Sequence, residues 1–336
     1  MLTKLTIRNF KRFDEAVIDL TGNVVLIGPN NAGKTTALQA LALWDVGYRT
    51  WIDKRGTGEV TLKRSGVSIN RRDMVAVPVP AANLLWRDKH TRSISRSSGR
   101  QQTDNVRIDI LVEGILEGRT WSCGLEFDYA NEESFHCRPL RLEQGKNPPR
   151  MSVPELSGKM SIAFLPPMSG LADREFLKQS GEIGVLLGQG QTAQVLRNSC
   201  YQVYTNKKAE SDWGKVVMAV RDLFGVELLD PVLRDTAEIT LAYREQSGQE
   251  FDLSASGRGM QQTLLLLTHL YANPHSVLLL DEPDAHLEIL RQRQIYNLIT
   301  ETAGHQQSQI IAASHSEVVL NEAATKDTVI AFVGKP

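Results

Sequence analysis

The residues best suited to chemistry form a glycine-rich run that ends in a lysine and two threonines. Gly28 and Gly33 are separated by four residues and followed by Lys34 and Thr35, which is the P-loop spacing. Glycines allow backbone N–H groups to turn toward phosphate oxygens, and the lysine supplies positive charge to the β and γ phosphates. The threonine hydroxyl is a ligand for Mg²⁺. The predicted triphosphate site consists of Gly28, Pro29, Asn30, Asn31, Ala32, Gly33, Lys34, Thr35 and Thr36.

The sequence on either side of this loop predicts the elements that hold it. Residues 24–27 are apolar and mostly β-branched, which is typical of a buried parallel strand. After the loop, apolar residues between positions 37 and 43 recur at helical spacing. A glycine turn with a chance Lys-Thr pair would not require this strand and helix, so the phosphate-binding interpretation is favoured.

A second chemical cluster follows another apolar run. Residues 277–280 predict a buried strand that leads into Asp281 and Glu282. An acidic residue at the carboxyl end of a strand beside a P-loop strand can hold Mg²⁺, usually through water. The next acid, Glu282, is placed to orient or deprotonate an attacking water. The alternative is a turn that merely contains two carboxylates.

A third apolar run, residues 310–313, ends at Ser314 and His315. If its strand is parallel to the other two, all three carboxyl ends lie at one edge of the sheet. We therefore predict that His315 hydrogen-bonds the γ-phosphate or the attacking water. With Lys34 and Glu282 it completes the predicted catalytic set, and Thr35 with Asp281 is the predicted metal pair.

Two further segments are candidate anion contacts. Ser256 and Gly257 precede a leucine-rich helix, and small residues at a helix start can bind phosphate, although such a run is also a common helix cap. Near the amino terminus, Lys11 and Arg12 lie in a turn between two alternating strands in residues 1–20. These cations could reach phosphate, and Phe10 or Phe13 could pack on a base. A basic surface turn with core phenylalanines explains the same residues equally well.

Charge is distributed unevenly along the chain. The 336 residues carry a formal net charge of −1. Residues 49–107 contain 13 Lys and Arg against 5 Asp and Glu, so this segment carries 13 − 5 = +8 and the remainder −9. Trp51 and Trp86 are interleaved with the cations, and residues 92–100 are expected to form a mobile loop. We predict DNA contact through this segment, against the alternative of a solvated face.

Other features bear on location and on the surrounding architecture. Cys123, Cys137 and Cys200 lack metal-ligand spacing and are expected to be reduced thiols. No apolar run approaches the roughly 18 residues of a membrane span, so a soluble cytoplasmic protein is expected. Residues 106–147 alternate like antiparallel strands, and residues 170–230 look helical, with Ser211 as the cap of a helix that Gly225 ends.

Taken in order, these motifs resemble the ATP-binding-cassette ATPases, and within them the OLD (overcoming lysogenisation defect), RecF and SMC-like branch. Residues 28–36 look like the Walker A motif, 278–282 like Walker B, and 285–288 like the D-loop. Ser256-Gly257 is similar to a degenerate signature motif, and His315 to the switch histidine. The opening residues 5–11 resemble the starts of these proteins, and residues 282–287 are close to the OLD form, as in Gabija-like defence ATPases.

This resemblance implies a fold and a mode of action. The expected fold is α/β: an ABC-ATPase head with a RecA-like mixed sheet around the P-loop, an antiparallel β lobe and a helical lobe. It implies a single composite domain with segments 1–168, 169–250 and 251–336, the middle one for dimerisation. ATP and Mg²⁺ are the implied cofactors. A homodimer or higher even oligomer is implied, with Ser256 and Gly257 closing on the other copy's γ-phosphate, alongside a partner nuclease domain such as TOPRIM in phage defence.

The chain departs from the family pattern in specific places. No glutamine follows the strand near Phe164 where a Q-loop would lie, and Arg258 replaces a usual glycine. No coiled-coil heptads interrupt the chain, and the nuclease is expected elsewhere. A RecF-like repair ATPase, a slow ATP sensor and a transporter subunit are the alternatives, and the last lacks a membrane-coupling segment. DNA stimulation of ATP turnover would distinguish the repair and nuclease readings from the sensor.

Overall fold

The computed structural model describes residues 1–59, 65–74, 76–97, 100–143, 148–156, 160–168, 170–206 and 210–333. Contacts divide the chain into two compact units. The first unit comprises Met1–Gly22, Gly28–Ile162 and Ile330–Pro336, and the second comprises Asn23–Ile27 and Ala163–Val329. This division does not test the predicted segment boundaries, which stay predictions. Within the described parts of the chain, no helix has the length and apolar character needed to cross a membrane.

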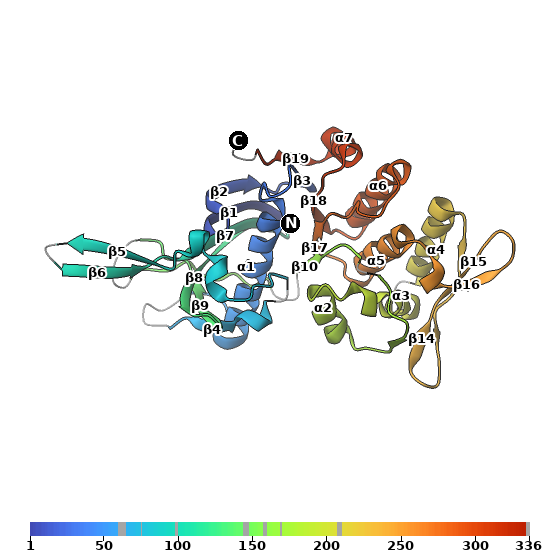
Figure 1. Ribbon diagram of the computed structural model, residues 1–336, viewed down its shortest axis with the longest axis horizontal. Helices are drawn as coiled ribbons and strands as arrows, with labels where there is room; N and C mark the ends of the chain where they lie inside the picture. Colours follow the sequence, from blue (N-terminus) through green and yellow to red (C-terminus); the bar gives the residue numbers. More distant parts are fainter. Residues whose placement is uncertain are drawn as a thin grey trace. The chain divides into compact units, whose positions relative to one another are not determined.

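The first unit is built on a six-stranded antiparallel sheet (Figure 1). Its strand order is β2-β1-β7-β8-β9-β4. The strands are β1 (Leu2–Phe10), β2 (Phe13–Asp19), β4 (Val67–Asn70), β7 (Ile108–Leu116), β8 (Arg119–Asn131) and β9 (Ser134–Pro139). The hairpin of residues 1–20 and the later antiparallel strands are therefore confirmed. Glu117 and Gly118, between β7 and β8, both have positive φ.

One face of this sheet is covered by α1 (Lys34–Arg55), the helix that follows the glycine loop. Trp44 Nε1 donates to the Cys123 carbonyl at 2.9 Å. At Gly47, a Cβ atom would lie 2.9 Å from the Phe127 ring, so glycine allows the helix to approach β8 closely. These buried contacts fix the helix, and with it the start that faces the loop.

Part of the basic segment differs from the sequence prediction. Residues 49–55 of this segment form the end of α1. Trp51 and Trp86 are buried in the core, so they are not aromatic contacts on a surface. The loop predicted at residues 92–100 is instead an antiparallel hairpin of β5 (Arg92–Ser97) and β6 (Arg100–Asn105), which extends from the sheet in Figure 1. Residues 60–64, 75 and 98–99 lie outside the described chain.

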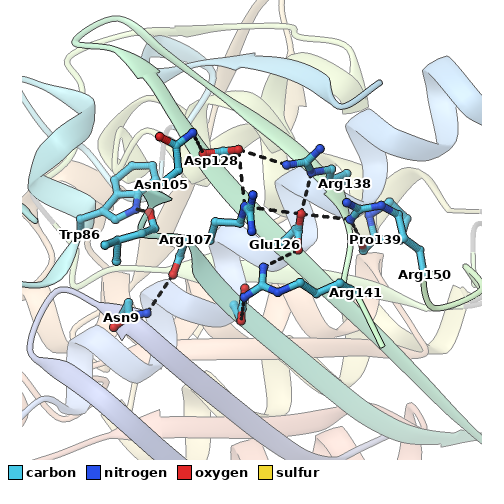
Figure 2. Close-up of polar contacts among 12 residues, drawn as sticks. Asn9, Trp86, Asn105, Arg107, Glu126, Asp128, Arg138, Pro139, Arg141 and Arg150 are labelled. Atoms are coloured by element: carbon cyan, nitrogen blue, oxygen red, sulfur yellow. Dashed lines mark hydrogen bonds and ion pairs between the residues drawn. The ribbon is translucent and has the colours of Figure 1, made fainter. Parts of the chain in front are cut away.

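The opposite face of the sheet carries a row of charged residues that are in register across neighbouring strands. Arg8 of β1 pairs with Asp109 of β7, which pairs with Glu126 of β8 and then Arg138 of β9. Glu126 is fully buried, and Figure 2 shows arginines converging on it. The guanidinium groups within 4 Å of its carboxylate are those of Arg107, Arg138, Arg141 and Arg150.

The second unit contains a five-stranded sheet of order β10-β17-β18-β3-β19. The strands are β10 (Ser161–Leu165), β17 (Ser276–Asp281), β18 (Gln309–Ala313), β3 (Val24–Ile27) and β19 (Thr328–Ala331). The pairings of β17 with β18 and of β18 with β3 are parallel, as predicted. Strand β3 is short and apolar, and it lies between β18 and β19 in this sheet.

Helices and short strands complete the second unit. The helices are α2 (Ser180–Gly188), α3 (Leu196–Thr205), α4 (Glu210–Phe224), α5 (Arg258–Ala272), α6 (Ile289–His305) and α7 (Glu317–Lys326). Two small sheets contain β11 (Glu175–Phe176), β14 (Glu238–Thr240) and β13 (Val232–Leu233), and β12 (Glu227–Leu228), β15 (Ala242–Arg244) and β16 (Glu250–Asp252). The 3₁₀ helices are Arg71–Asp73, Ala82–Leu85, Arg87–Lys89, Thr192–Gln194 and Leu253–Ala255.

The helical prediction for residues 170–230 is confirmed in outline and wrong in one detail. α4 begins at Glu210, so Ser211 lies in its first turn and is not its cap. Gly225 follows the helix with a φ of 71°, which is the left-handed conformation expected at a helix end. The buried leucines of α5 pack in one cluster with α3, α4 and strands β17 and β18.

Candidate active site

The glycine loop has the backbone geometry of a phosphate cradle. Gly28 and Gly33 have φ values of 142° and 116°, and Asn31 has 61°. Such angles disfavour side chains at the two glycines and let successive N–H groups turn inward. Gly33 is the N-cap of α1, and no acidic residue lies in the first turn of that helix. The helix start therefore presents partial positive charge without a competing carboxylate.

Lys34 is folded back over its own loop. Its side chain is buried, and Nζ donates to the carbonyls of Gly28 at 2.8 Å and Pro29 at 3.1 Å. An ammonium held above the loop in this way is in place to meet phosphate oxygens that the loop N–H groups bind. Thr35 and Thr36 follow in the first turn, and Thr36 is also buried.

Aromatic and basic residues from distant parts of the first unit surround this loop. A Cβ at Gly33 would lie 3.0 Å from the Phe13 ring and 3.6 Å from Phe332. Phe13 and Phe332 pack at 6.1 Å between ring centroids. Of the two sequence candidates, Phe10 is fully buried, and the Phe13 ring lies beside Gly33 of the loop.

Lys11 and Arg12 differ in their surroundings. Lys11 Nζ donates to Oε1 of Gln39 on α1 at 2.6 Å, and burial lowers the pKa of Lys11 to about 8. Arg12 is exposed. Lys11 is therefore tied to the helix that begins at Lys34, and the proposed phosphate contact of both cations stays a prediction.

In the second unit, strand register brings the acidic edge together. Ala313 of β18 pairs with Asp281 of β17 on one side and with Leu26 of β3 on the other. Ser314 N donates to the Leu26 carbonyl at 3.0 Å, and Glu282 N donates to the Ala313 carbonyl at 2.8 Å. The carboxyl ends of the three strands are thus level, and β3 ends one residue before Gly28.

Glu282 and His315 face each other at this edge. His315 Nε2 lies 3.4 Å from Glu282 Oε1, and both side chains remain partly exposed. The backbone φ of Glu282 is 50°, which is unusual for a residue other than glycine. A carboxylate and an imidazole in contact can position a water and exchange a proton with it.

Nearby, Asp284 and Ser314 form a contact that the sequence did not single out. Ser314 Oγ donates to Asp284 Oδ1 at 2.8 Å. Burial raises the pKa of Asp284, opposed by the Ser314 hydrogen bond. Asp284 lies two residues after Glu282, and Ser314 lies directly before His315. This closeness in sequence to two predicted catalytic residues was the available signal for the contact.

The Ser256-Gly257 segment lies at the start of α5, as predicted. Ser256 Oγ donates to the Leu253 carbonyl at 2.6 Å, and Gly257 is the N-cap of the helix. Beside it is a cavity of about 320 Å³ whose lining includes Ser256, Gly257, Arg258, His286, Leu287 and Arg291. At the place of the missing Q-loop glutamine, the backbone N–H of Met168 donates to Oε1 of Gln262, which comes from α5.

The site residues thus fall into two described groups. The loop with Lys34 belongs to the first unit, and Asp281, Glu282 and His315 belong to the second. Their meeting around one triphosphate stays a prediction. The loop N–H groups, the Lys34 ammonium and the hydroxyl of Thr35 suit a Mg²⁺ nucleotide, as does the carboxylate of Asp281.

Comparisons with known proteins find two ATPase-domain family models and a nuclease relative. A family model described as an AAA domain, putative AbiEii toxin, Type IV TA system, matches residues 206–321, and one described as an AAA ATPase domain matches residues 1–47. The chain is 23% identical over 334 residues to an OLD nuclease of Thermus scotoductus, covering 95% of this chain and 59% of that protein. It therefore spans less than two thirds of that relative.

Solved structures show the same fold. An Smc head bound to the C-winged helix domain of ScpA matches with a TM-score of 0.52 and 12% identity, covering 98% of this chain and 93% of that one. An Smc head with an extended coiled coil, bound to the C-terminal domain of ScpA derived from Pyrococcus furiosus, gives 0.51 and 12%, covering 98% and 92%.

The fold and the P-loop define an ABC-type ATPase head. The chain thus has the fold of an Smc head, and its sequence is similar to AAA ATPase domains and to an OLD nuclease.

Proposed function

We propose that this chain binds ATP with Mg²⁺ and hydrolyses it, using Lys34 for the phosphates, Thr35 and Asp281 for the metal, and Glu282 with His315 for the attacking water. The supporting observation is the level edge of β17, β18 and β3, where Asp281 and Leu26 both pair with Ala313. Strand β3 continues directly into the glycine loop. The glycine loop and the acidic residues after β17 therefore both extend from the carboxyl ends of parallel strands. Phosphate ligands bind at such strand ends in α/β proteins.

Lys34→Ala tests the nucleotide site. Removing a charge-assisted hydrogen bond should weaken ATP binding by about 10- to 100-fold and abolish turnover. Binding of a fluorescent ATP analogue and release of phosphate are the measurements. Lys54→Ala, at the exposed far end of the same helix, is the matched control and should behave as the wild type. Equal ATP affinity in the Lys34 and Lys54 variants would reject the proposed function.

We further propose that the ATP cycle assembles two copies and regulates a nuclease in phage defence, in the cytoplasm. The resemblance to an OLD nuclease that is longer than this chain supports the nuclease link. Exposed Ile289 and Leu290 at the start of α6 support an apolar contact with a second copy, beside the cavity at Ser256 and Gly257. A RecF-like repair ATPase and a slow ATP sensor are the competing functions.

DNA is the proposed polyanionic ligand, bound through the β5–β6 hairpin. The hairpin strands carry Arg92, Arg96 and Arg100 against a single acid, Asp104. Reversing these three charges should lower the salt dependence of DNA binding, with the slope of log K against log salt falling by up to about 3. Reversal of Arg174, Arg221 and Arg234, exposed in the second unit, changes net charge equally and is the control. Identical slopes in both variants would exclude the hairpin.

A further inference from the structure

A buried serine joins the two loops that carry the proposed base and its histidine. Ser314 has no exposed surface, and its Oγ donates to Asp284 Oδ1 at 2.8 Å. Asp284 is two residues after Glu282, and Ser314 immediately precedes His315. This hydrogen bond is therefore a second link between the loops, independent of the 3.4 Å contact between Glu282 and His315 themselves.

The backbone fixes Ser314 from two further directions. Its N–H donates to the Leu26 carbonyl at 3.0 Å, and its Oγ accepts from Ser316 N at 3.0 Å. A hydroxyl has one proton to donate, and here that proton is committed to Asp284. The serine thus connects the end of β3, just before the glycine loop, with the acidic turn after β17.

The connection continues to α6. Ser316 Oγ donates to Gln292 Oε1 at 2.6 Å, and Gln292 Nε2 donates to the Leu287 carbonyl at 3.2 Å. The chain of hydrogen bonds therefore runs from the edge of the sheet through the histidine loop to the segment that begins α6. That segment carries the exposed pair Ile289 and Leu290.

The acidic turn needs external support because its backbone is strained. Glu282 and His286 have φ values of 50° and 67°, in the left-handed region that side chains other than glycine rarely occupy. Inside the turn, Ala285 N donates to the Glu282 carbonyl at 3.0 Å and Leu287 N to the Asp284 carbonyl at 3.2 Å. Ser314, immediately after β18, adds a side-chain hydrogen bond to this turn.

We propose that Asp284 and Ser314 are positioning residues that hold Glu282 and His315 in register and transmit their state to the start of α6. This role rests on the proposed ATP hydrolysis. Neither residue contacts nucleotide in this account, so their loss should affect the chemical step and leave ATP binding intact. The partly exposed Glu282 side chain would otherwise be free to leave the water that it activates.

The test compares two substitutions at the same hydrogen bond. Ser314→Ala removes the donor, while Asp284→Asn keeps the Oδ1 acceptor and removes only the charge. Ser314→Ala should lower kcat by about 10- to 100-fold with KM within about twofold, because small misplacements of a catalytic group have effects of this size. Asp284→Asn should retain most of kcat. Ser276→Ala, at a buried serine at the far end of β17, is the control and should match the wild type.

The outcomes separate this role from the proposed function. A wild type without Lys34-dependent turnover overturns both. If the wild type hydrolyses ATP and the kcat of Ser314→Ala is unchanged, the positioning role alone is overturned. The positioning role is also overturned if the kcat of Asp284→Asn falls as far as that of Ser314→Ala. Urea unfolding of each variant checks that it is folded. If Ser314→Ala does not fold, Asp284→Ala removes the bond from the other side, and the same division between kcat and KM applies.

Discussion

At the scale of single residues, the glycine loop depends on a contact with the end of the described chain. A Cβ atom at Gly28 would lie 2.3 Å from the Phe332 carbonyl oxygen, a backbone atom that cannot move aside as a flexible side chain can. Gly28 also has a φ of 142°, outside the range that other residues adopt. Two independent constraints therefore require glycine here.

Gly28→Ala should consequently destabilise the first unit by roughly 1–3 kcal/mol and weaken ATP binding, because the loop or the Phe332 segment must shift. Urea unfolding and nucleotide binding are the measurements. Gly214→Ala, in α4 with open space around the Cβ position, is the control and should raise stability by about 0.5–1 kcal/mol. A neutral Gly28→Ala variant would show that the contact with Phe332 is not required.

The contiguous part of the site could be predicted from sequence, and the long-range part could not. Lys34, Asp281 and His315 each follow an apolar run that identifies a strand, so local pattern was enough. Phe332 reaches Gly28 across about three hundred residues of chain, and no local pattern encodes that contact. The bond between Ser314 and Asp284 is likewise set by strand register, which becomes known only with the fold.

At the scale of elements, the charged row across the antiparallel sheet combines stabilising and destabilising members. Burial alone would raise the pKa of Glu126, but Arg150, Arg138 and Arg141 together lower it. Asp109, directly opposite on β7, forms an ion pair with Arg141 at 3.2 Å. Its burial raises the pKa of Asp109 from an ordinary 3.8 to about 6. The two neighbouring acids therefore have opposite linkage to pH.

For Asp109 the folded pKa is above the unfolded one, so its favourable contribution is complete below about pH 4 and is lost as pH rises through about 6. Asp109→Asn should therefore raise stability relative to the wild type at pH 7.5, by on the order of 1 kcal/mol, and by a smaller amount at pH 5. Urea unfolding at both pH values measures this.

Glu126→Gln is the control with the opposite sign. Because the pKa of Glu126 is lowered in the folded protein, its charge stabilises the fold at pH values above the ordinary pKa of a glutamate. This contribution is lost as pH falls, so the Glu126→Gln variant should be destabilised most at pH 7.5. An Asp109→Asn effect that is the same at pH 5 and pH 7.5 would contradict the account.

Element boundaries show where local pattern misled. Alternation correctly predicted β1, β2, β7 and β8, because apolar residues recur at every second position in each. The polar composition of residues 49–55 concealed the last turns of α1, whose length is set by packing on the sheet. In β5 and β6 the pairing of two polar strands forms a hairpin that hydrophobic periodicity could not indicate.

At the scale of the whole molecule, the proposed ATP hydrolysis uses residues from both compact units. Strand β3 belongs to the second unit, while the loop that follows it belongs to the first. Hydrolysis as proposed requires Lys34 and Glu282 to act on one nucleotide, and assembly requires a second copy. Glu282 is therefore the residue that we propose activates water for a nucleotide held by the loop.

Glu282→Gln tests that claim most directly, because it preserves shape and removes the base. ATP turnover, retained nucleotide and molecular mass by light scattering are measured with Mg²⁺. Turnover should fall about 100-fold or more, while the variant keeps ATP and doubles its mass relative to the nucleotide-free protein. Turnover equal to that of the wild type would contradict the claim.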